Sequence, residues 1–173
     1  MQLKAAGLDM VYMGIESGDP QVLKDVKKGV TREEMIEAGR KLKRCGILCS
    51  ATLISGLGGR QRLREHAIAS ASLISAIKPD YVGFLTLMID PQAPVYSKIV
   101  SGELELLNPE DVVEEMKLFL QNVDSEGTVF RSNHASNYVI LKGTLNEDIP
   151  SMLAYLRQVE EQGKYREERW RRF

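Results

Sequence analysis

The chain has 173 residues, of which 43% are hydrophobic and 27% are charged, and its formal net charge is −1. These values are typical of a soluble globular protein of one domain, and they exclude a disordered, collagen-like or disulfide-dense chain. Binding to phosphate backbones needs an excess of Lys and Arg, so the charge balance argues against nucleic acid as a main partner.

The apolar pattern along the chain predicts strands and helices in alternation. Short buried runs are bounded by turn residues, and longer amphipathic runs begin at capping residues such as Asp19, Thr31 with Glu34, and Asn108. Glycines close the helices that end near Gly7 and Gly46. We expect strands at residues 10–15, 47–54, 81–87 and 128–131, and helical segments at 1–7, 20–27, 32–45, 61–77, 95–101, 109–122 and 147–161.

This order predicts an α/β fold made of about four parallel βα units, which is a half (β/α) barrel of the TIM type. The sequence shows no obvious fifth strand to close the sheet. The chain opens on the end of a helix, so we expect it to be part of a longer fold. We assign residues 1–162 to the partial barrel and 163–173 to a charged tail, which either docks as a terminal helix or contacts RNA or a partner surface.

Chemistry in parallel α/β barrels is concentrated where the strands end. Glu16 and Ser17 follow the first strand, where they either bind a sugar diol or an ammonium group or simply form the turn before Asp19. Residues 55–59, Ser-Gly-Leu-Gly-Gly, let a ligand approach the backbone and offer N–H groups at a helix start. They match neither the P-loop nor the dinucleotide spacing.

The fourth strand is followed by a polar stretch with one of the two histidines in the chain. His134 is a candidate acid, base or substrate-orienting donor, or else a hydrogen-bonded loop histidine. Arg131, Asn133 and Asn137 are the other candidates on the substrate side. His66, inside a predicted helix, is expected to be structural.

Cys45 and Cys49 are the only cysteines. They have the first spacing of C-x3-C-x2-C, but the next position of that motif is Thr52. An iron–sulfur cluster needs a set of thiolates on an accessible loop. We therefore interpret both cysteines as core residues and expect no metal site in this chain.

Several segments resemble the radical S-adenosylmethionine (radical SAM) enzymes. Residues 14–19, Gly-Ile-Glu-Ser-Gly-Asp, and residues 51–59 look like the fourth and fifth strands of that barrel, over a match that spans about residues 5–160. Residues 78–81, 85–87 and 133–137, with Pro94 and Tyr96, resemble the branch related to oxygen-independent coproporphyrinogen oxidase.

The resemblance implies roles for four residues in binding S-adenosylmethionine. Glu16 and Ser17 would contact its ribose or methionine part, and Ile54 and Gly56 fit the fifth-strand G-x-I-x-G-x-x-E pattern that supports the adenine. Thr52 replaces the first glycine of that pattern and Gly59 replaces its glutamate. The family uses S-adenosylmethionine with a 4Fe–4S cluster, but the sequence lacks both the cluster motif and the ammonium-binding motif.

The sequence therefore predicts the C-terminal part of a radical SAM oxidoreductase-like enzyme that is inactive alone, with an unknown small-molecule substrate. The alternative is a non-catalytic nucleotide-binding or self-assembling half-barrel module. The expected partner is the missing N-terminal half of the barrel or a second copy of the chain. No apolar stretch reaches the ~18 residues that cross a bilayer and no signal peptide is present, so we expect no membrane partner and a cytoplasmic location.

Overall fold

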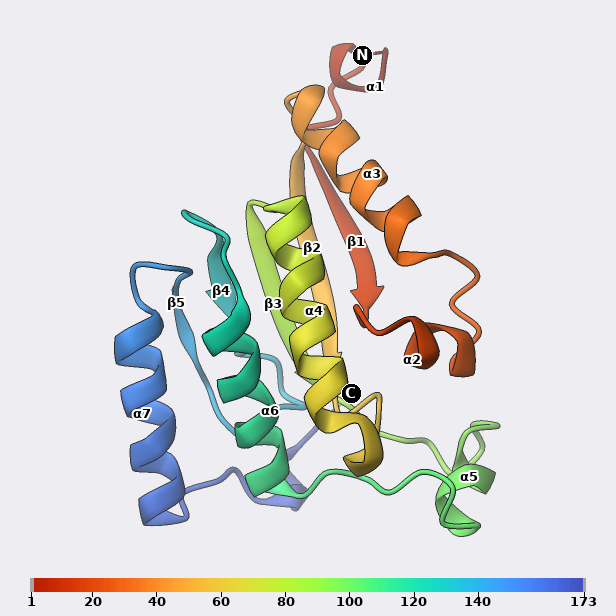
Figure 1. Cartoon of the computed structure of the whole chain (residues 1–173), viewed down its shortest axis with the longest axis vertical. Coiled ribbons are helices and arrows are strands. Elements are labelled where there is room, and N and C mark those ends of the chain that lie inside the picture. Colours follow the sequence, from red (N-terminus) through yellow and green to blue (C-terminus); the bar gives the residue numbers. More distant parts are fainter. Residues whose placement is uncertain (1, 173) are drawn as a thin grey trace.

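Five strands form one open sheet in the order β1-β2-β3-β4-β5 (Figure 1). The computed structural model describes residues 2–172. Met1, the first residue of the predicted segment 1–7, and Phe173, the last residue of the predicted tail 163–173, lie outside the described residues. The first four strands run parallel, and the last pairs antiparallel with β4. The strands are β1 (Met10–Glu16), β2 (Leu48–Ser55), β3 (Tyr81–Thr86), β4 (Val129–Arg131) and β5 (Lys142–Thr144).

The helices begin and end close to the residues that the sequence indicates. Thr31 and Glu34 form the predicted capping box, and Gly46 has a φ of 67°, the left-handed conformation that stops a helix. The helices are α1 (Gln2–Ala5), α2 (Pro20–Asp25), α3 (Arg32–Arg44), α4 (Leu63–Ile77), α5 (Tyr96–Val100), α6 (Pro109–Asn122) and α7 (Ile149–Gln162), with 3-10 turns η1 (Arg60–Arg62) and η2 (Glu168–Trp170).

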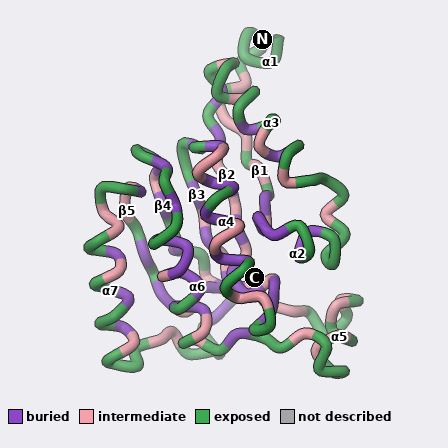
Figure 2. Tube along the Cα trace, viewed as in Figure 1, coloured by how far each residue is buried: buried purple, intermediate pink, exposed green. Residues whose placement is uncertain are grey.

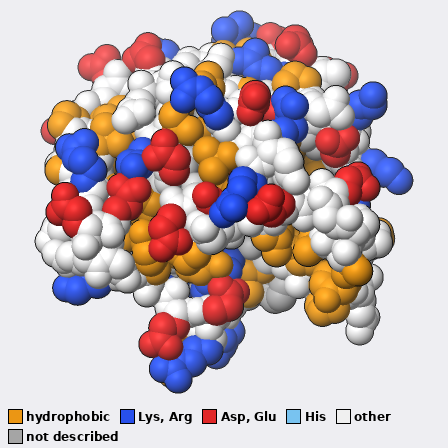
Figure 3. Space-filling model, turned by 60° about the horizontal axis from the view of Figure 1, so that its bottom comes forward, with side chains coloured by type: hydrophobic (Ala, Val, Ile, Leu, Met, Phe, Trp, Pro, Cys, Tyr) orange, Lys and Arg blue, Asp and Glu red, His pale blue; other side chains and the backbone are white. Residues whose placement is uncertain are grey.

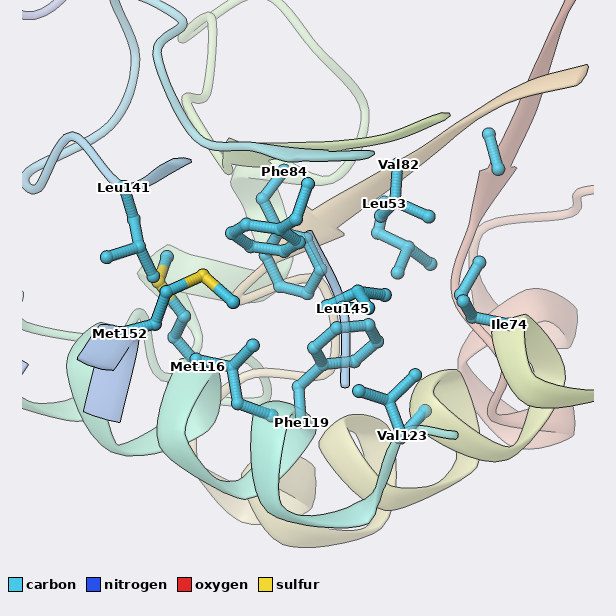
Figure 4. Close-up of a cluster of buried hydrophobic side chains, with 14 of the residues drawn as sticks. Leu53, Ile74, Val82, Phe84, Met116, Phe119, Val123, Leu141, Leu145 and Met152 are labelled. Carbon is cyan, nitrogen blue, oxygen red and sulfur yellow. The ribbon is translucent and has the colours of Figure 1, made fainter. Parts of the chain in front are cut away.

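The helices α3, α4, α6 and α7 form one layer along one face of the sheet (Figure 1). The core lies between this layer and the strands, and buried residues follow that boundary in Figure 2. Its centre is an aromatic cluster in which the Phe84 ring lies 4.7 Å from Phe119 and 5.3 Å from Phe130, centroid to centroid. Aliphatic side chains such as Leu53 and Leu145 surround it (Figure 4). Buried aromatic and aliphatic area of this kind is the main stabilising term of the fold.

The opposite face of the sheet has no helix layer among the described residues. Side chains alternate along the strands, so Ile15 enters the core whereas Tyr12, on the other face, is 78% exposed. A Cβ added to Gly83 on β3 would meet no atom within 4 Å, which shows how open this face is. The arrangement is that of a half barrel whose inner face is open.

The predicted α/β half barrel is confirmed, but the prediction that no fifth strand exists is wrong. Residues 142–144 form a short antiparallel strand whose pairing with β4 covers that edge of the parallel sheet. Its sequence, Lys-Gly-Thr, contains no apolar run. The strand arises from tertiary pairing and not from its own hydrophobic pattern.

Candidate functional site

The turn at the end of β1 is irregular at Glu16. The pairing with β2 shifts between Gly14 and Glu16, and Glu16 has a φ of 66°, in the left-handed region that a non-glycine residue seldom adopts. The N–H of Ser17 donates to the carbonyl of Ile15 at 2.8 Å and closes a tight turn. Backbone strain of this kind concentrates at functional sites.

This irregularity turns the Glu16 carboxylate to the helix-free face of the sheet. A Cβ built on Gly14 would lie 2.4 Å from Oε1 of Glu16, so that carboxylate covers Gly14, on the side opposite to buried Ile15. Lys28 holds it with an Nζ–Oε1 distance of 3.4 Å, and each of the two side chains is about a quarter exposed. Glu16 can therefore reach a ligand that lies over the open face.

The next residues of the turn fold in the other direction, against α4. Ser17 is fully buried, and its Oγ accepts the N–H of Asp19 at 3.0 Å. The N–H of Gly18 donates to Oγ of Ser70 at 2.9 Å, and Arg62 binds the buried carboxylate of Asp19 at 2.8 Å. Ser17 thus shapes the turn that presents Glu16, and its own hydroxyl faces the protein interior.

The glycine turn after β2 is closed by a buried carboxylate. Oε2 of Glu115, from α6, accepts the Ser55 hydroxyl at 2.5 Å and the N–H of Gly56 at 2.9 Å. Oε1 of Glu115 lies 2.9 Å from Nδ1 of His66, on α4. The sequence indicated free N–H groups in this turn, but the one on Gly56 already donates to a carboxylate. His66 is buried, as predicted for a structural residue.

The polar stretch after β4 forms hydrogen bonds with the end of β3. The N–H of Thr86 donates to Oγ of Ser136 at 3.1 Å, and the Asn137 side chain accepts from Oγ1 of Thr86 and donates to the carbonyl of Phe84. β4 pairs with β3 only at residues 81–83, so these side chains satisfy polar groups that the short strand leaves without partners. Nδ1 of His134 accepts the N–H of Ser136 at 3.2 Å.

The C-terminal tail is docked and inserts Arg171 at the strand ends. Its guanidinium lies 4.0 Å from the centre of the Tyr138 ring and donates to Glu168 and to the carbonyls of Ser136 and Leu87. Burial, followed by the hydrogen bond to Glu168, raises the pKa of Tyr138 to about 12. The sequence does not distinguish Arg171 from the other charges of the basic tail, which are expected to be solvated.

Arg171 closes one side of a cavity of about 330 Å³ at the ends of β2 and β3. Apolar residues from the segment after β3 form most of its walls. The lining residues are Ser55, Gly56, Thr86, Leu87, Met88, Ile89, Tyr96, Ile99, Leu106, Leu107, Tyr138, Glu168 and Arg171. Of the predicted binding residues, Gly56 lines this cavity.

The structure divides the other predicted residues between two faces. Ile54 and Arg131 follow the alternation of the helix-free face, where Glu16 also lies. Asn137 is buried against β3, while Asn133 and His134 are exposed in the loop after β4. The candidates therefore do not converge on one point. They surround the carboxyl ends of the strands from both sides.

The two cysteines occupy unlike places. Cys45 ends α3, and Cys49 is buried in β2, where burial and then the charge of Asp80 raise the pKa of its thiol to about 11. Within residues 2–172, no three His, Cys, Asp or Glu side chains are grouped to hold a metal ion. A 4Fe–4S cluster does not fit these residues, since it needs a set of accessible thiolates.

Residues 1–68 match the family model described as the radical SAM superfamily. Over this segment the chain is therefore similar to that superfamily. The matched residues include β1, the Glu16 turn, β2 and the glycine turn, which are the segments that carry the resemblance in the sequence.

The chain is also similar to longer proteins. It is 27% identical over 104 residues to an uncharacterized methyltransferase of Pyrococcus horikoshii, a match that covers 60% of this chain and 22% of that protein. Its fold matches the archaeal Elp3 of Methanocaldococcus infernus with an N-terminal deletion, with a TM-score of 0.64 and 21% identity. That superposition covers 94% of this chain and 38% of the Elp3 chain, and it shows a shared fold.

In Figure 3 acidic and basic side chains are interspersed over the face that is turned forward. No helix within residues 2–172 is long and apolar enough to cross a membrane.

Proposed function

We propose that this chain is a portion of a radical SAM barrel whose strand ends hold the nucleoside part of S-adenosylmethionine. The observation that carries the proposal is Glu16. It lies within the segment that matches the superfamily, it has a strained left-handed backbone, and its carboxylate lies on the helix-free face at the end of β1. A carboxylate there can accept hydrogen bonds from a ribose diol.

The cluster chemistry of the superfamily would need thiolates beyond the two cysteines that this sequence contains. In the parent enzyme we propose reductive cleavage of S-adenosylmethionine and radical chemistry on a substrate that remains unknown. When bound by such thiolates, the cluster would supply the electron. The residues of this chain would orient the nucleoside, and the exposed side chains of Arg131, Asn133 and His134 would border the substrate. The side chain of Asn137 is buried and would hold the loop after β4 against β3.

A nucleotide-binding module without chemistry is the second candidate, because the turns at Glu16 and Gly56 could hold a nucleoside without a cluster. The helix-free sheet face needs a cover in either case, since Tyr12 is 78% exposed and β1 is an edge strand. We propose that the remainder of a barrel or a second copy supplies it. The coproporphyrinogen oxidase-like branch is a proposal that rests on residues 78–81, 85–87 and 133–137 with Pro94 and Tyr96. The two similar proteins described above carry other descriptions.

The test is a ligand-detected NMR titration with S-adenosylmethionine and S-adenosylhomocysteine. Without cluster contacts we expect similar, weak binding of both ligands, with dissociation constants in the order of 0.1 to 1 mM. Glu16→Ala should abolish the signal, whereas Glu33→Ala, an exposed acid on α3, should keep it. If a folded sample shows no binding at millimolar ligand, or if binding does not depend on Glu16, the proposal is wrong.

A further inference from the structure

Glu115 is a carboxylate in the interior of the protein. It is 1% exposed on α6, and its partner His66 is 2% exposed on α4. Moving a carboxylate out of water costs several kcal/mol unless donors replace the lost hydration. Here Ser55, Gly56 and His66 surround its two oxygens.

Three donors offset that cost but do not explain why a carboxylate is there. An apolar side chain of similar size at a buried ionic position often gives equal or greater stability. Nε2 of His66 is buried without a hydrogen-bond partner, so this arrangement is not optimised for stability. A polar group kept under such conditions points to a role in the geometry or charge of its surroundings.

The carboxylate joins the start of the glycine turn to two helices. Gly56 has a φ of 82°, and the carbonyl of Ser55 accepts the N–H of Leu87 at 2.9 Å. The position of Ser55 and Gly56 is thereby fixed relative to α4, α6 and the end of β3. Oε2 of Glu115 lies 2.9 Å from the backbone nitrogen of Gly56, so this N–H is not available to a phosphate group.

We propose that Glu115 is a positioning residue that holds the Ser55–Gly56 turn and makes the strand-end site select uncharged nucleosides or cationic sulfonium ligands over phosphorylated nucleotides. The inference rests on the proposed function for the identity of the site. Its electrostatic half follows from Coulomb repulsion between the carboxylate and a phosphate. Its positional half follows from the two hydrogen bonds that the turn donates to Oε2.

The experiment compares wild type with Glu115→Gln, which removes the charge at nearly constant shape. Glu114→Gln is the matched control, because Glu114 is a half-exposed acid on the same helix that pairs with Lys117. The affinities for adenosine and ADP are measured by NMR titration of folded protein. We expect wild type and the control to prefer adenosine, and Glu115→Gln to raise the ratio of ADP to adenosine affinity about fivefold, the effect of one screened unit charge. If Glu115 had a purely structural role, Glu115→Gln would leave the ratio of ADP to adenosine affinity unchanged. An unchanged ratio would therefore overturn the electrostatic half.

Amide hydrogen exchange at Gly56 tests the positional half without any ligand. We expect exchange of the Gly56 amide to be at least about tenfold faster in both Glu115→Leu and Ser55→Ala than in wild type. Glu115→Leu removes the carboxylate that accepts this N–H, and Ser55→Ala removes the neighbouring hydrogen bond to the same carboxylate. Equal protection in both variants would overturn the positional half. If wild type binds neither adenosine nor ADP, the proposed function and the electrostatic half fail together, while the exchange result still decides the positional half. The Ser55 variant serves if Glu115→Leu does not fold.

Discussion

Gly18 has no room for a side chain, so Gly18→Ala should be strongly destabilising. A Cβ at this position would lie 2.3 Å from the carbonyl oxygen of Ala69 and 2.6 Å from the Cα of Ser70, both backbone atoms of α4. A helix backbone cannot yield as a flexible side chain can. The turn that presents Glu16 would therefore have to move away from α4.

The expected loss has two parts. Overpacking of a rigid interior costs about 1 to 3 kcal/mol. Separating the turn from α4 also breaks the buried hydrogen bond from Gly18 to Ser70, worth about 1 kcal/mol. We expect Gly18→Ala to lower the free energy of unfolding by about 2 to 4 kcal/mol.

Urea unfolding followed by circular dichroism measures this loss as a shift in midpoint at constant slope. Ser70→Ala isolates the hydrogen bond and should cost about 1 kcal/mol. Gly83→Ala is the matched control, because its Cβ would enter open space on the helix-free face, and its stability should equal or slightly exceed that of wild type. If Gly18→Ala is no less stable than Ser70→Ala, the steric argument is refuted.

Three further predictions concern the thiols, the tail and the open sheet. In a Cys45→Ser background at pH 8, Cys49 should react with iodoacetamide at least about 100-fold more slowly in folded protein than in urea, since its pKa is about 11 instead of 9.0; equal rates would contradict its burial. Burial raises the pKa of Glu168, but hydrogen bonds from Arg171 and Tyr138 lower it more, so the docked tail should be stable above about pH 4.5 and should be released as the pH falls through this lowered pKa. Release would be seen as faster hydrogen exchange of the Arg166 amide, which donates to the carbonyl of Tyr138. Arg171→Met should release the tail at neutral pH, and a protected Arg166 amide in that variant would disprove the docking role. Light scattering at tens of micromolar should show a dimer that Tyr12→Lys dissociates, and a monodisperse wild-type monomer would mean that the open face needs no partner.

The elements that could be predicted are those whose signal is local. Thr31 with Glu34 identifies a helix start, Gly46 a helix stop, and the buried strands appear as short apolar runs. β5 could not be found this way, because residues 142–144 form a strand only through pairing with β4. The positions of the strand ends followed from the same local signals.

The direction of each side chain at those ends could not be predicted. The irregular turn at Glu16 sends that carboxylate to one face and the hydroxyl of Ser17 to the other, although the two residues are adjacent. Glu115 did leave a signal, since it stands among apolar residues at positions 112, 116 and 119 that share its helix face. An acid within such a stripe predicts a buried polar partner, but its partner Ser55 is 60 residues away in the sequence.

The residues that set the character of the strand-end cavity come from two parts of the chain. Ser55 and Gly56 belong to the segment that matches the superfamily, whereas Glu115, Tyr138 and Arg171 come after it. The matched segment supplies the backbone frame, and the later residues supply a fixed negative charge behind the turn and a guanidinium with its donors already engaged at the cavity wall. Ligand preference should therefore depend on the charge of Glu115 as well as on that of Glu16 in the matched segment, so Glu115→Gln should alter the ratio of ADP to adenosine affinity more than Ile54→Val, which changes only apolar surface.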